Sequence, residues 1–257
     1  MTETLMVYSE SGGATKTTTA VSLAASMASE GHRVVLVDLD PRAAATNWFG
    51  VQPSAPGLHV GAILAAPDPT GWAEEMAVPS GWFDTLRVVT SDRNVSLREQ
   101  ENDPTMDARL RASLIDVEAD VIVIDCPNRQ GGTLARSAFT AADTVVYAAT
   151  PTTDGYDGVM GAQRSIEAFK TYRTQLGAPV TIREAGIVLG AVQETVMSRT
   201  AKSILEDLRD TGMLLTPIVP HRGIVQETRL TNEWFGNYRK GIPVADAYKS
   251  LSKQVLR

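Results

Sequence analysis

The sequence predicts an α/β protein with a doubly wound, mostly parallel sheet and helices on both faces, folded as one domain over residues 1–257. Two observations support this prediction. Short runs rich in Val, Ile and Leu alternate along the chain with longer stretches of helical spacing, which is typical of strand–helix–strand units. Several of the runs are apolar on both faces, as parallel strands covered on each side should be.

Six segments are predicted to be strands because they are short, β-branched and bounded by polar or turn residues. They are residues 5–9, 33–40, 85–91, 120–127, 143–150 and 184–192, with 214–220 as a weaker seventh candidate. Three stretches have helical spacing and a glycine at or near their ends: residues 15–31, 158–177 and 198–212. Residues 51–83, which are rich in proline, should form an excursion with a short helix at the edge of the sheet.

The composition indicates a soluble protein of the cytoplasm. Apolar residues make up 43% of the chain and charged residues 21%, which is ordinary for a globular domain. The single cysteine, Cys126, excludes a disulfide framework and fits a reducing compartment. The first residues lack the basic and apolar regions of a signal peptide, and no stretch approaches the ~20 apolar residues that span a bilayer.

The distribution of charge bears on nucleic acid as a partner. The net charge of −6 argues against it, but residues 195–257 hold ten Lys and Arg against six Asp and Glu. A localised basic patch can bind phosphates on an acidic protein. The alternative is a solvated helical surface with a chance excess of positive charge.

Residues 9–25, SESGGATKTTTAVSLAA, are predicted to be a phosphate-binding loop that leads from a strand into a helix. Backbone N–H groups at the start of a helix form a concavity that suits polyphosphate. Lys16 would contact the β- and γ-phosphates and the Thr17 hydroxyl would bind Mg²⁺. The usual pattern is G-x-x-x-x-G-K-[ST], whereas this loop has Glu10 and Thr15 in place of the two glycines.

Carboxylates follow two other predicted strands. Asp38 and Asp40 end the segment 33–40, and Asp125 ends the apolar run of 120–127. Parallel sheets bind ligands at the carboxyl ends of their strands, so these groups are candidates to hold a magnesium nucleotide. Any one of them could instead be a capping or turn residue. Three such features at successive strand ends favour nucleotide binding.

The loop together with residues 34–50 and 121–151 resembles the ParA/Soj/MinD group of deviant Walker-type ATPases, which have a P-loop NTPase fold. Residues 216–256 resemble the C-terminal part of the ParA branch. The resemblance implies ATP and Mg²⁺ as cofactors, a homodimer formed with ATP, nonspecific DNA binding, and a ParB-like or other adaptor that stimulates hydrolysis. It further implies a cytoplasmic, nucleoid-associated protein that partitions or positions cargo.

The resemblance also assigns roles to residues. Lys16 and Asp40 would be catalytic, with Asp40 positioning the attacking water. Thr17 and Asp125 would support Mg²⁺. The expected nucleotide-binding residues are Ser11, Gly12, Gly13, Ala14, Thr15, Lys16, Thr17, Thr18 and Pro220, the last near the adenine.

Two positions depart from the family pattern. Ser11 stands where members usually carry a signature lysine that reaches the partner's nucleotide, and we expect Arg129 to substitute for it; the alternative is an arginine on a mobile surface loop. A cation beside the transferring phosphoryl group is worth a rate factor on the order of 10³–10⁵ where it acts as an arginine finger. Thr15 either adopts an ordinary backbone conformation or stores ~1–3 kcal/mol of strain.

The DNA contacts are expected from the basic C-terminal region. The resemblance places arginines of this region on the face that touches phosphates. The expected residues are Arg199, Lys202, Arg222, Arg229, Arg239 and Lys240. The last residues lack the bulky apolar face of a membrane-binding helix, so no membrane partner is expected.

Three other functions remain open. One is positioning of a protein cargo, as in the McdA branch, in which the signature lysine is likewise missing. Another is a pseudo-ATPase regulator that binds ATP as a structural ligand. The third is a metabolic or metal-cofactor-maturation enzyme of the P-loop class, which would tend to show a further substrate pocket or a cysteine pair.

Overall fold

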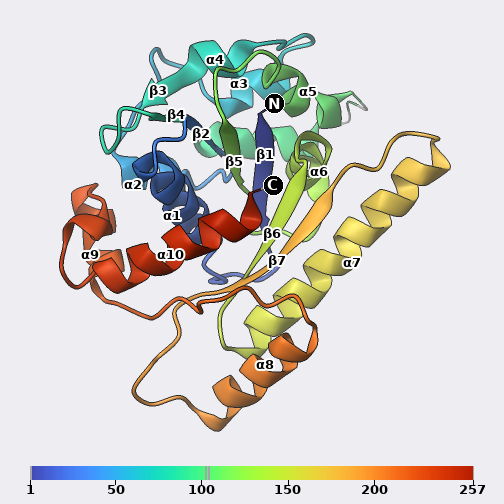
Figure 1. Ribbon diagram of the computed structural model, residues 1–257. Helices are drawn as coiled ribbons and strands as arrows, with labels where there is room; N and C mark the ends of the chain where they lie inside the picture. The colour runs from blue at the N-terminus through green and yellow to red at the C-terminus, as the bar shows by residue number, and fades with distance from the viewer. Residues whose placement is uncertain (1, 102, 104, 257) are drawn as a thin grey trace.

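The structure is a computed structural model that describes residues 2–101, 103 and 105–256. Its centre is a seven-stranded sheet in the order β3-β4-β2-β5-β1-β6-β7 (Figure 1). All neighbouring strands are parallel except β3, which pairs antiparallel with β4 at one edge. The strands are β1 (Glu3–Tyr8), β2 (Val34–Asp38), β3 (Ala77–Pro79), β4 (Leu86–Val89), β5 (Val121–Asp125), β6 (Thr144–Ala149) and β7 (Arg183–Leu189).

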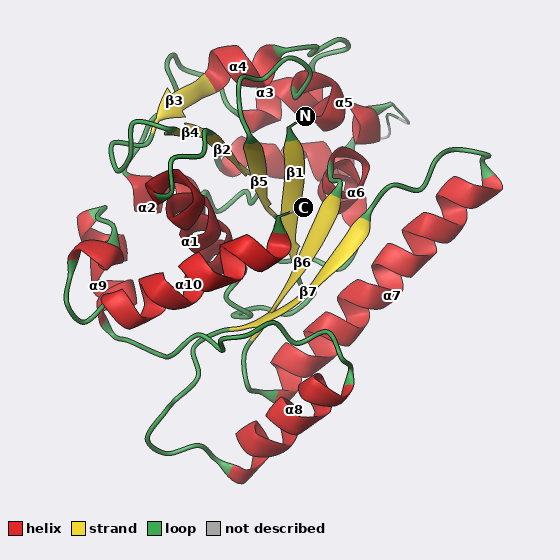
Figure 2. Cartoon of the chain, in the orientation of Figure 1, coloured by secondary structure: helices red, strands yellow, loops and turns green. Residues whose placement is uncertain are grey.

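Helices cover both faces of the sheet, as predicted (Figure 2). One face carries α1 (Lys16–Ser29), α2 (Ala44–Phe49), α9 (Ile224–Thr231) and α10 (Ile242–Val255). The other carries α3 (Val60–Ala65), α4 (Trp72–Met76), α5 (Met106–Ser113), α6 (Gly132–Ala141), α7 (Thr153–Gln175) and α8 (Arg199–Asp210). Two 3₁₀ segments, η1 (Arg93–Gln100) and η2 (Phe235–Asn237), complete the described elements.

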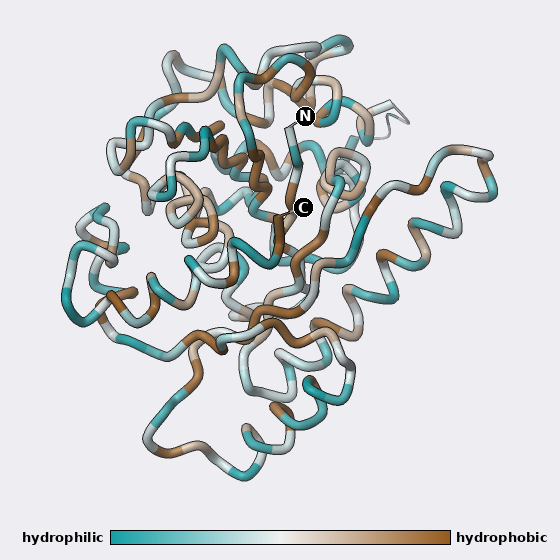
Figure 3. The backbone as a smooth tube through the Cα atoms, in the orientation of Figure 1, coloured by the Kyte–Doolittle hydropathy of each residue, from teal (hydrophilic) through white to brown (hydrophobic). Residues whose placement is uncertain are grey.

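The alternation of side chains along β1 shows how the sheet separates two hydrophobic cores. Leu5 and Val7 pack with α1 and α10 on one face, while Met6 and Tyr8 pack with α6 and α7 on the other. All four are fully buried. The central strands are accordingly mostly hydrophobic, with polar residues at some of their ends (Figure 3). This layering confirms the predicted doubly wound architecture. It also brings the carboxyl ends of the parallel strands together at the same end of the sheet.

Two of the predicted segments differ from what the structure shows, and the predicted helical stretches do not include α2, α5, α6, α9 and α10. Residues 214–220 form only isolated bridges, Ile187 with Leu214 and Val192 with Pro220. Pro217 and Pro220 have no N–H to donate, which prevents a continuous ladder. Residues 51–83 hold two short helices, α3 and α4, and the unpredicted edge strand β3. Of the helices in the described part of the chain, none has the length and apolar character that crossing a membrane requires.

Candidate functional site

The loop between β1 and α1 is held closed by the lysine expected to bind phosphate. Lys16 is the first residue of α1 and is only 6% exposed. Its Nζ donates to the Ser11 carbonyl at 2.8 Å and to Asn128 Oδ1 at 3.3 Å. Burial lowers the pKa of the ammonium, and the negative charge of Asp125 opposes that shift. Lys16 therefore points into the concavity of the loop, where phosphate oxygens could replace its two acceptors.

Of the two backbone conformations expected for Thr15, the structure shows the strained one. It has φ 64° and ψ 17°, the left-handed region that a β-branched residue rarely adopts. Its hydroxyl donates to the Ala14 carbonyl at 2.6 Å. Its side chain also packs against Gly190 after β7, where an added Cβ would lie 2.8 Å from Thr15 Oγ1. The threonine thus places the end of the loop against the segment that follows β7.

Glu10, at the place of the first missing glycine, joins the loop to α7. Its carboxylate accepts from the hydroxyl of Ser165 at 2.5 Å and from that of Tyr8 at 3.4 Å. A Cβ on Gly161 would come within 2.2 Å of this carboxylate, and one on Gly158 within 2.4 Å of Ser11 Cβ. Glycines one turn apart on α7 therefore let the loop lie directly on the helix.

Asp38 and Asp125 end adjacent strands and are paired in register. Asp38 is a structural anchor: its carboxylate accepts from the backbone N–H and the hydroxyl of Thr46, both at 2.8 Å, and from the Asp40 N–H at 3.1 Å. Burial raises the pKa of Asp38 to about 6, against the opposing effect of these hydrogen bonds. The carboxylate thereby fixes residues 39–46, which are the loop after β2 and the first turn of α2.

Asp125 has the properties expected of a magnesium-supporting group. It is fully buried, and neither carboxylate oxygen has a hydrogen-bond partner among the described residues. Burial and the charge of Asp38 raise its pKa well above the ordinary value, while Thr17 and Lys16 act to lower it. A buried carboxylate without donors beside a threonine hydroxyl fits a hard divalent cation, which takes oxygen ligands.

Asp40 lies in a different environment. Its side chain is 4% exposed and forms an ion pair with Arg42, whose side chain is 67% exposed. Arg42 Nη2 lies 2.7 Å from Asp40 Oδ2, and Nε lies 3.2 Å from both carboxylate oxygens. Arg42 is not among the residues predicted from the sequence. An arginine two residues after a candidate catalytic carboxylate is the signal that could have identified it.

Arg129 lies in the same cleft as Asp40 and Arg42, which Asn128 and Glu99 also line. Its side chain is exposed and makes no hydrogen bond or ion pair with another described residue. The structure therefore places Arg129 near Asp40, beyond the carboxyl ends of the strands, but no contact with a described residue fixes its guanidinium.

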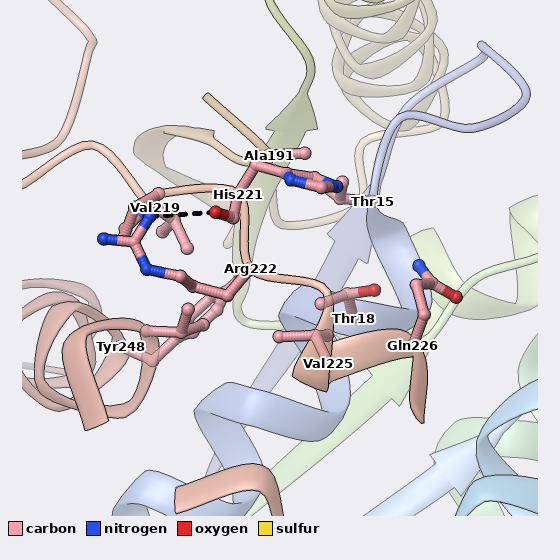
Figure 4. A pocket seen from close by; sticks show the side chains of 11 residues that line it. Thr15, Thr18, Ala191, Val219, His221, Arg222, Val225, Gln226 and Tyr248 are labelled. Atoms are coloured by element: carbon pink, nitrogen blue, oxygen red, sulfur yellow. Dashed lines mark hydrogen bonds between the residues drawn. The ribbon is translucent and has the colours of Figure 1, made fainter. Parts of the chain in front are cut away.

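Pro220 lines a small pocket that adjoins the phosphate-binding loop at Thr15 (Figure 4). Thr15 and Thr18 form one wall, and Val225, Gln226 and Tyr248 lie around it. Apolar walls with a few polar groups suit a flat heteroaromatic ring. The pocket adjoins the loop, as a base-binding site next to a phosphate-binding loop must.

The six expected DNA-binding residues do not form one patch. Arg199 and Lys202 are exposed at the start of α8, and Arg239 and Lys240 are exposed before α10. Arg222 forms an ion pair with Glu194. Arg229 lies 5.1 Å above the Trp48 ring, and burial lowers the pKa of its guanidinium. Figure 1 shows α8 and α9 well separated.

Trp48, the ring against which Arg229 packs, belongs to an aromatic cluster formed by three segments that are distant in the sequence. Trp48 and Phe49 of α2 contact Trp82, which in turn contacts Trp234. Phe235 lies 4.1 Å from Trp234, centroid to centroid, and Trp82 Nε1 donates to the Asn232 carbonyl at 2.9 Å. The cluster joins α2, whose first turn contains Thr46, to the segment around α9.

The chain is similar to several partition proteins. It is 27% identical over 253 residues to the chromosome-partitioning ATPase Soj of Thermus thermophilus, covering 98% of this chain and 94% of that one. It is 25% identical over 259 residues to the sporulation initiation inhibitor protein Soj of Bacillus subtilis, with 99% and 98% covered. A putative replication protein A of Sinorhizobium fredii is 35% identical over 167 residues, which are 58% of this chain and 40% of that longer protein.

Solved structures share the fold. Apo McdA of Cyanothece aligns with a TM-score of 0.82 at 20% identity and full coverage of both chains. Cobyrinic acid a,c-diamide synthase of Mycobacterium smegmatis, with bound ADP and magnesium, has a TM-score of 0.75 at 24% identity, covering 98% of this chain and 93% of that one. Residues 2–178 match the AAA domain family AAA_31. On these matches, the chain belongs to the AAA domain family and, within it, to the ParA/Soj/MinD group.

Proposed function

We propose that the protein is a ParA-type ATPase that binds Mg-ATP, dimerises with ATP, and binds DNA without sequence specificity. A partner protein would stimulate hydrolysis, and the cycle would partition or position a cargo on the nucleoid in the cytoplasm. The observation that supports the proposal is the buried carboxylate of Asp125, which accepts no hydrogen bond from the described residues and lies beside Thr17 and Lys16 at the phosphate-binding loop.

Each group has a distinct task in this reaction. Thr17 and Asp125 would hold Mg²⁺, which neutralises phosphate charge when it is bound. Lys16 would exchange the Ser11 carbonyl and Asn128 for phosphate oxygens. Asp40 would orient a water whose oxygen bonds to the γ-phosphorus while the bond from that phosphorus to the β–γ bridging oxygen breaks. The products are ADP and phosphate, and the water proton leaves through Asp40 or a phosphate oxygen.

The DNA-binding part of the proposal depends on the exposed basic residues at the start of α8 and before α10. Arg199 and Lys202 are one turn apart on α8 and have no described ion-pair partner. Lysine and arginine contacts to phosphates are independent of base sequence and weaken steeply with salt. A dimer would present two copies of each pair, which explains how an acidic monomer could bind DNA only in the ATP state.

The test is binding of a random-sequence DNA duplex at fixed salt by the apo, ADP and ATP forms. Lys16→Ala serves as the nucleotide-binding control, and Arg199→Ala/Lys202→Ala as the surface variant. Binding that appears only with ATP, and is lost in both variants, would support the proposal. ATP binding without DNA binding or hydrolysis in any state would instead indicate a pseudo-ATPase regulator.

The nature of the cargo is a separate question. The similarity to Soj proteins favours DNA, whereas an McdA-like protein would position a protein assembly. Purification of the ATP-bound dimer with its cellular partner would decide between them. A centromere-binding partner would support DNA partition, and an adaptor bound to a protein assembly would support the McdA-like role.

A further inference from the structure

The ion pair between Asp40 and Arg42 joins a fixed carboxylate to a movable cation. Asp40 is buried, and the Ser91 hydroxyl donates to its carbonyl at 2.8 Å. The Arg42 N–H also donates to Asp40 Oδ1 at 2.9 Å, so the backbone holds the start of the arginine in place. Most of the Arg42 side chain is in solvent. The guanidinium can therefore change partners without any movement of the chain that carries it.

Arg42 lies near the position that the terminal phosphate would take. It shares a cleft with Asn128, which accepts a hydrogen bond from Lys16 Nζ. The Arg42 charge is close enough to lower the pKa of the Lys16 ammonium. The loop itself offers no cation at Ser11, whose carbonyl only accepts from Lys16.

The other charged groups of the cleft leave Arg42 as the best-placed cation. Glu99 accepts from the backbone N–H groups of Thr133 and Leu134 at the start of α6, so it does not compete with Asp40 for the guanidinium. Arg129 has no fixed partner among the described residues. Arg42 starts from a held backbone N–H and an ion pair beside Asp40, so less of it must be ordered during the reaction than of Arg129.

We propose that Arg42 supplies, within the same chain, the positive charge that the loop lacks at Ser11. The guanidinium leaves Asp40 for the γ-phosphate oxygens when ATP binds, which frees the carboxylate to orient the attacking water. Without nucleotide the ion pair keeps Asp40 neutralised. This inference rests on the proposed ATPase function and adds a catalytic residue to it.

The experiment compares wild-type protein with Arg42→Ala, Arg42→Lys, Arg42→Gln and Arg129→Ala. Arg33→Ala is the matched control, because Arg33 also forms an exposed 2.8 Å ion pair, with Asp120, but at the amino ends of β2 and β5, away from the candidate site. Single-turnover hydrolysis and the dissociation constant of ATP are measured for each protein. A separate readout is the gain in affinity for ADP when aluminium fluoride is added, which mimics the transferring phosphoryl group.

We expect Arg42→Ala to slow hydrolysis by at least ~100-fold, a large part of the effect of an arginine finger, with ATP affinity changed by less than about threefold. The gain in ADP affinity on addition of aluminium fluoride should vanish in Arg42→Ala and Arg42→Gln. It should be partly retained in Arg42→Lys and unchanged in Arg33→Ala. If Arg42→Ala hydrolyses ATP like the wild type, or only Arg129→Ala is impaired, the role of Arg42 is disproved and the ATPase proposal stands. If wild-type protein binds ATP but never hydrolyses it, both proposals fail.

Discussion

Asp38 and Asp125 are register partners at the ends of β2 and β5, yet Asp38 accepts three hydrogen bonds and Asp125 accepts none from the described residues. The contrast separates two uses of a strand-end carboxylate. Asp38 builds the loop that carries Asp40, whereas Asp125 remains available for a ligand. A buried carboxylate without donors destabilises the free protein and creates the affinity that a cation can satisfy.

Replacing Asp125 with asparagine should separate stability from binding. Because the amide cannot ionise, we expect Asp125→Asn to raise the free energy of unfolding near pH 8 by about 1 kcal/mol or more. Mg²⁺-dependent ATP binding should weaken at least tenfold. Urea unfolding and titration of ATP with and without Mg²⁺ measure the two effects. Asp157→Asn, on the exposed side of α7, is the control, and unchanged magnesium dependence would contradict the assignment.

The raised pKa of Asp38 predicts a pH dependence of stability. The folded-state pKa is about 6, above the ordinary value of 3.8, so the folded protein binds the proton more tightly. The resulting contribution, roughly 3 kcal/mol, is fully present below about pH 4 and is lost as the pH rises through 6. We expect the unfolding free energy of the wild type, less that of Asp38→Asn, to fall between about pH 4 and about pH 6.5. A difference that rises over this interval would refute the prediction.

The contact between Thr15 and Gly190 can be tested with a double-mutant cycle. Thr15→Gly should keep nucleotide affinity and raise stability by ~1 kcal/mol, because glycine adopts φ 64° without strain. Gly190→Ala should weaken nucleotide binding, since its Cβ would lie 2.8 Å from Thr15 Oγ1. The double variant should recover the lost affinity. Additive losses would show that the two residues do not act through this contact.

The glycine contact between α7 and the loop predicts a larger effect. Gly158→Ala would place a Cβ 2.4 Å from Ser11 Cβ and 2.8 Å from Ser9 Oγ. We expect a loss of ~2–3 kcal/mol in stability together with weaker ATP binding, because the loop must move off the helix. Gly223→Ala is the control, since its nearest described neighbour would be 3.6 Å away. Equal effects of both substitutions on thermal unfolding and on ATP affinity would count against the contact.

Site residues whose position depends only on the strand that precedes them could be predicted from the sequence. Lys16, Asp40 and Asp125 each occupy the place that strand–helix alternation predicts for them. Its spacing from Asp40 could have marked Arg42 as a candidate, but the ion pair itself could not be predicted because local spacing does not fix which acceptor an exposed guanidinium chooses. The joining of Glu10 to α7 was out of reach for a related reason, since it depends on Gly161, 151 positions later in the chain.

The C-terminal predictions show the limit of charge counting. Arg229 contributes to the basic balance of residues 195–257, but the structure packs it over Trp48. A sequence provides the number of cations in a region and not which of them face solvent. Residues 214–220 show the same limit for strands, since the apolar pattern is present but the prolines remove the donors that a ladder needs.

The aromatic cluster has a practical consequence for following the protein in solution. Three of its members, Trp48, Trp82 and Trp234, are three of the four tryptophans in the chain. They lie between residues 39–46 and α9, the two segments that border the candidate nucleotide site. Any shift of residues 39–46 alters the surroundings of these indoles. The protein therefore carries its own optical reporter, whose emission should change with nucleotide state and needs no attached dye.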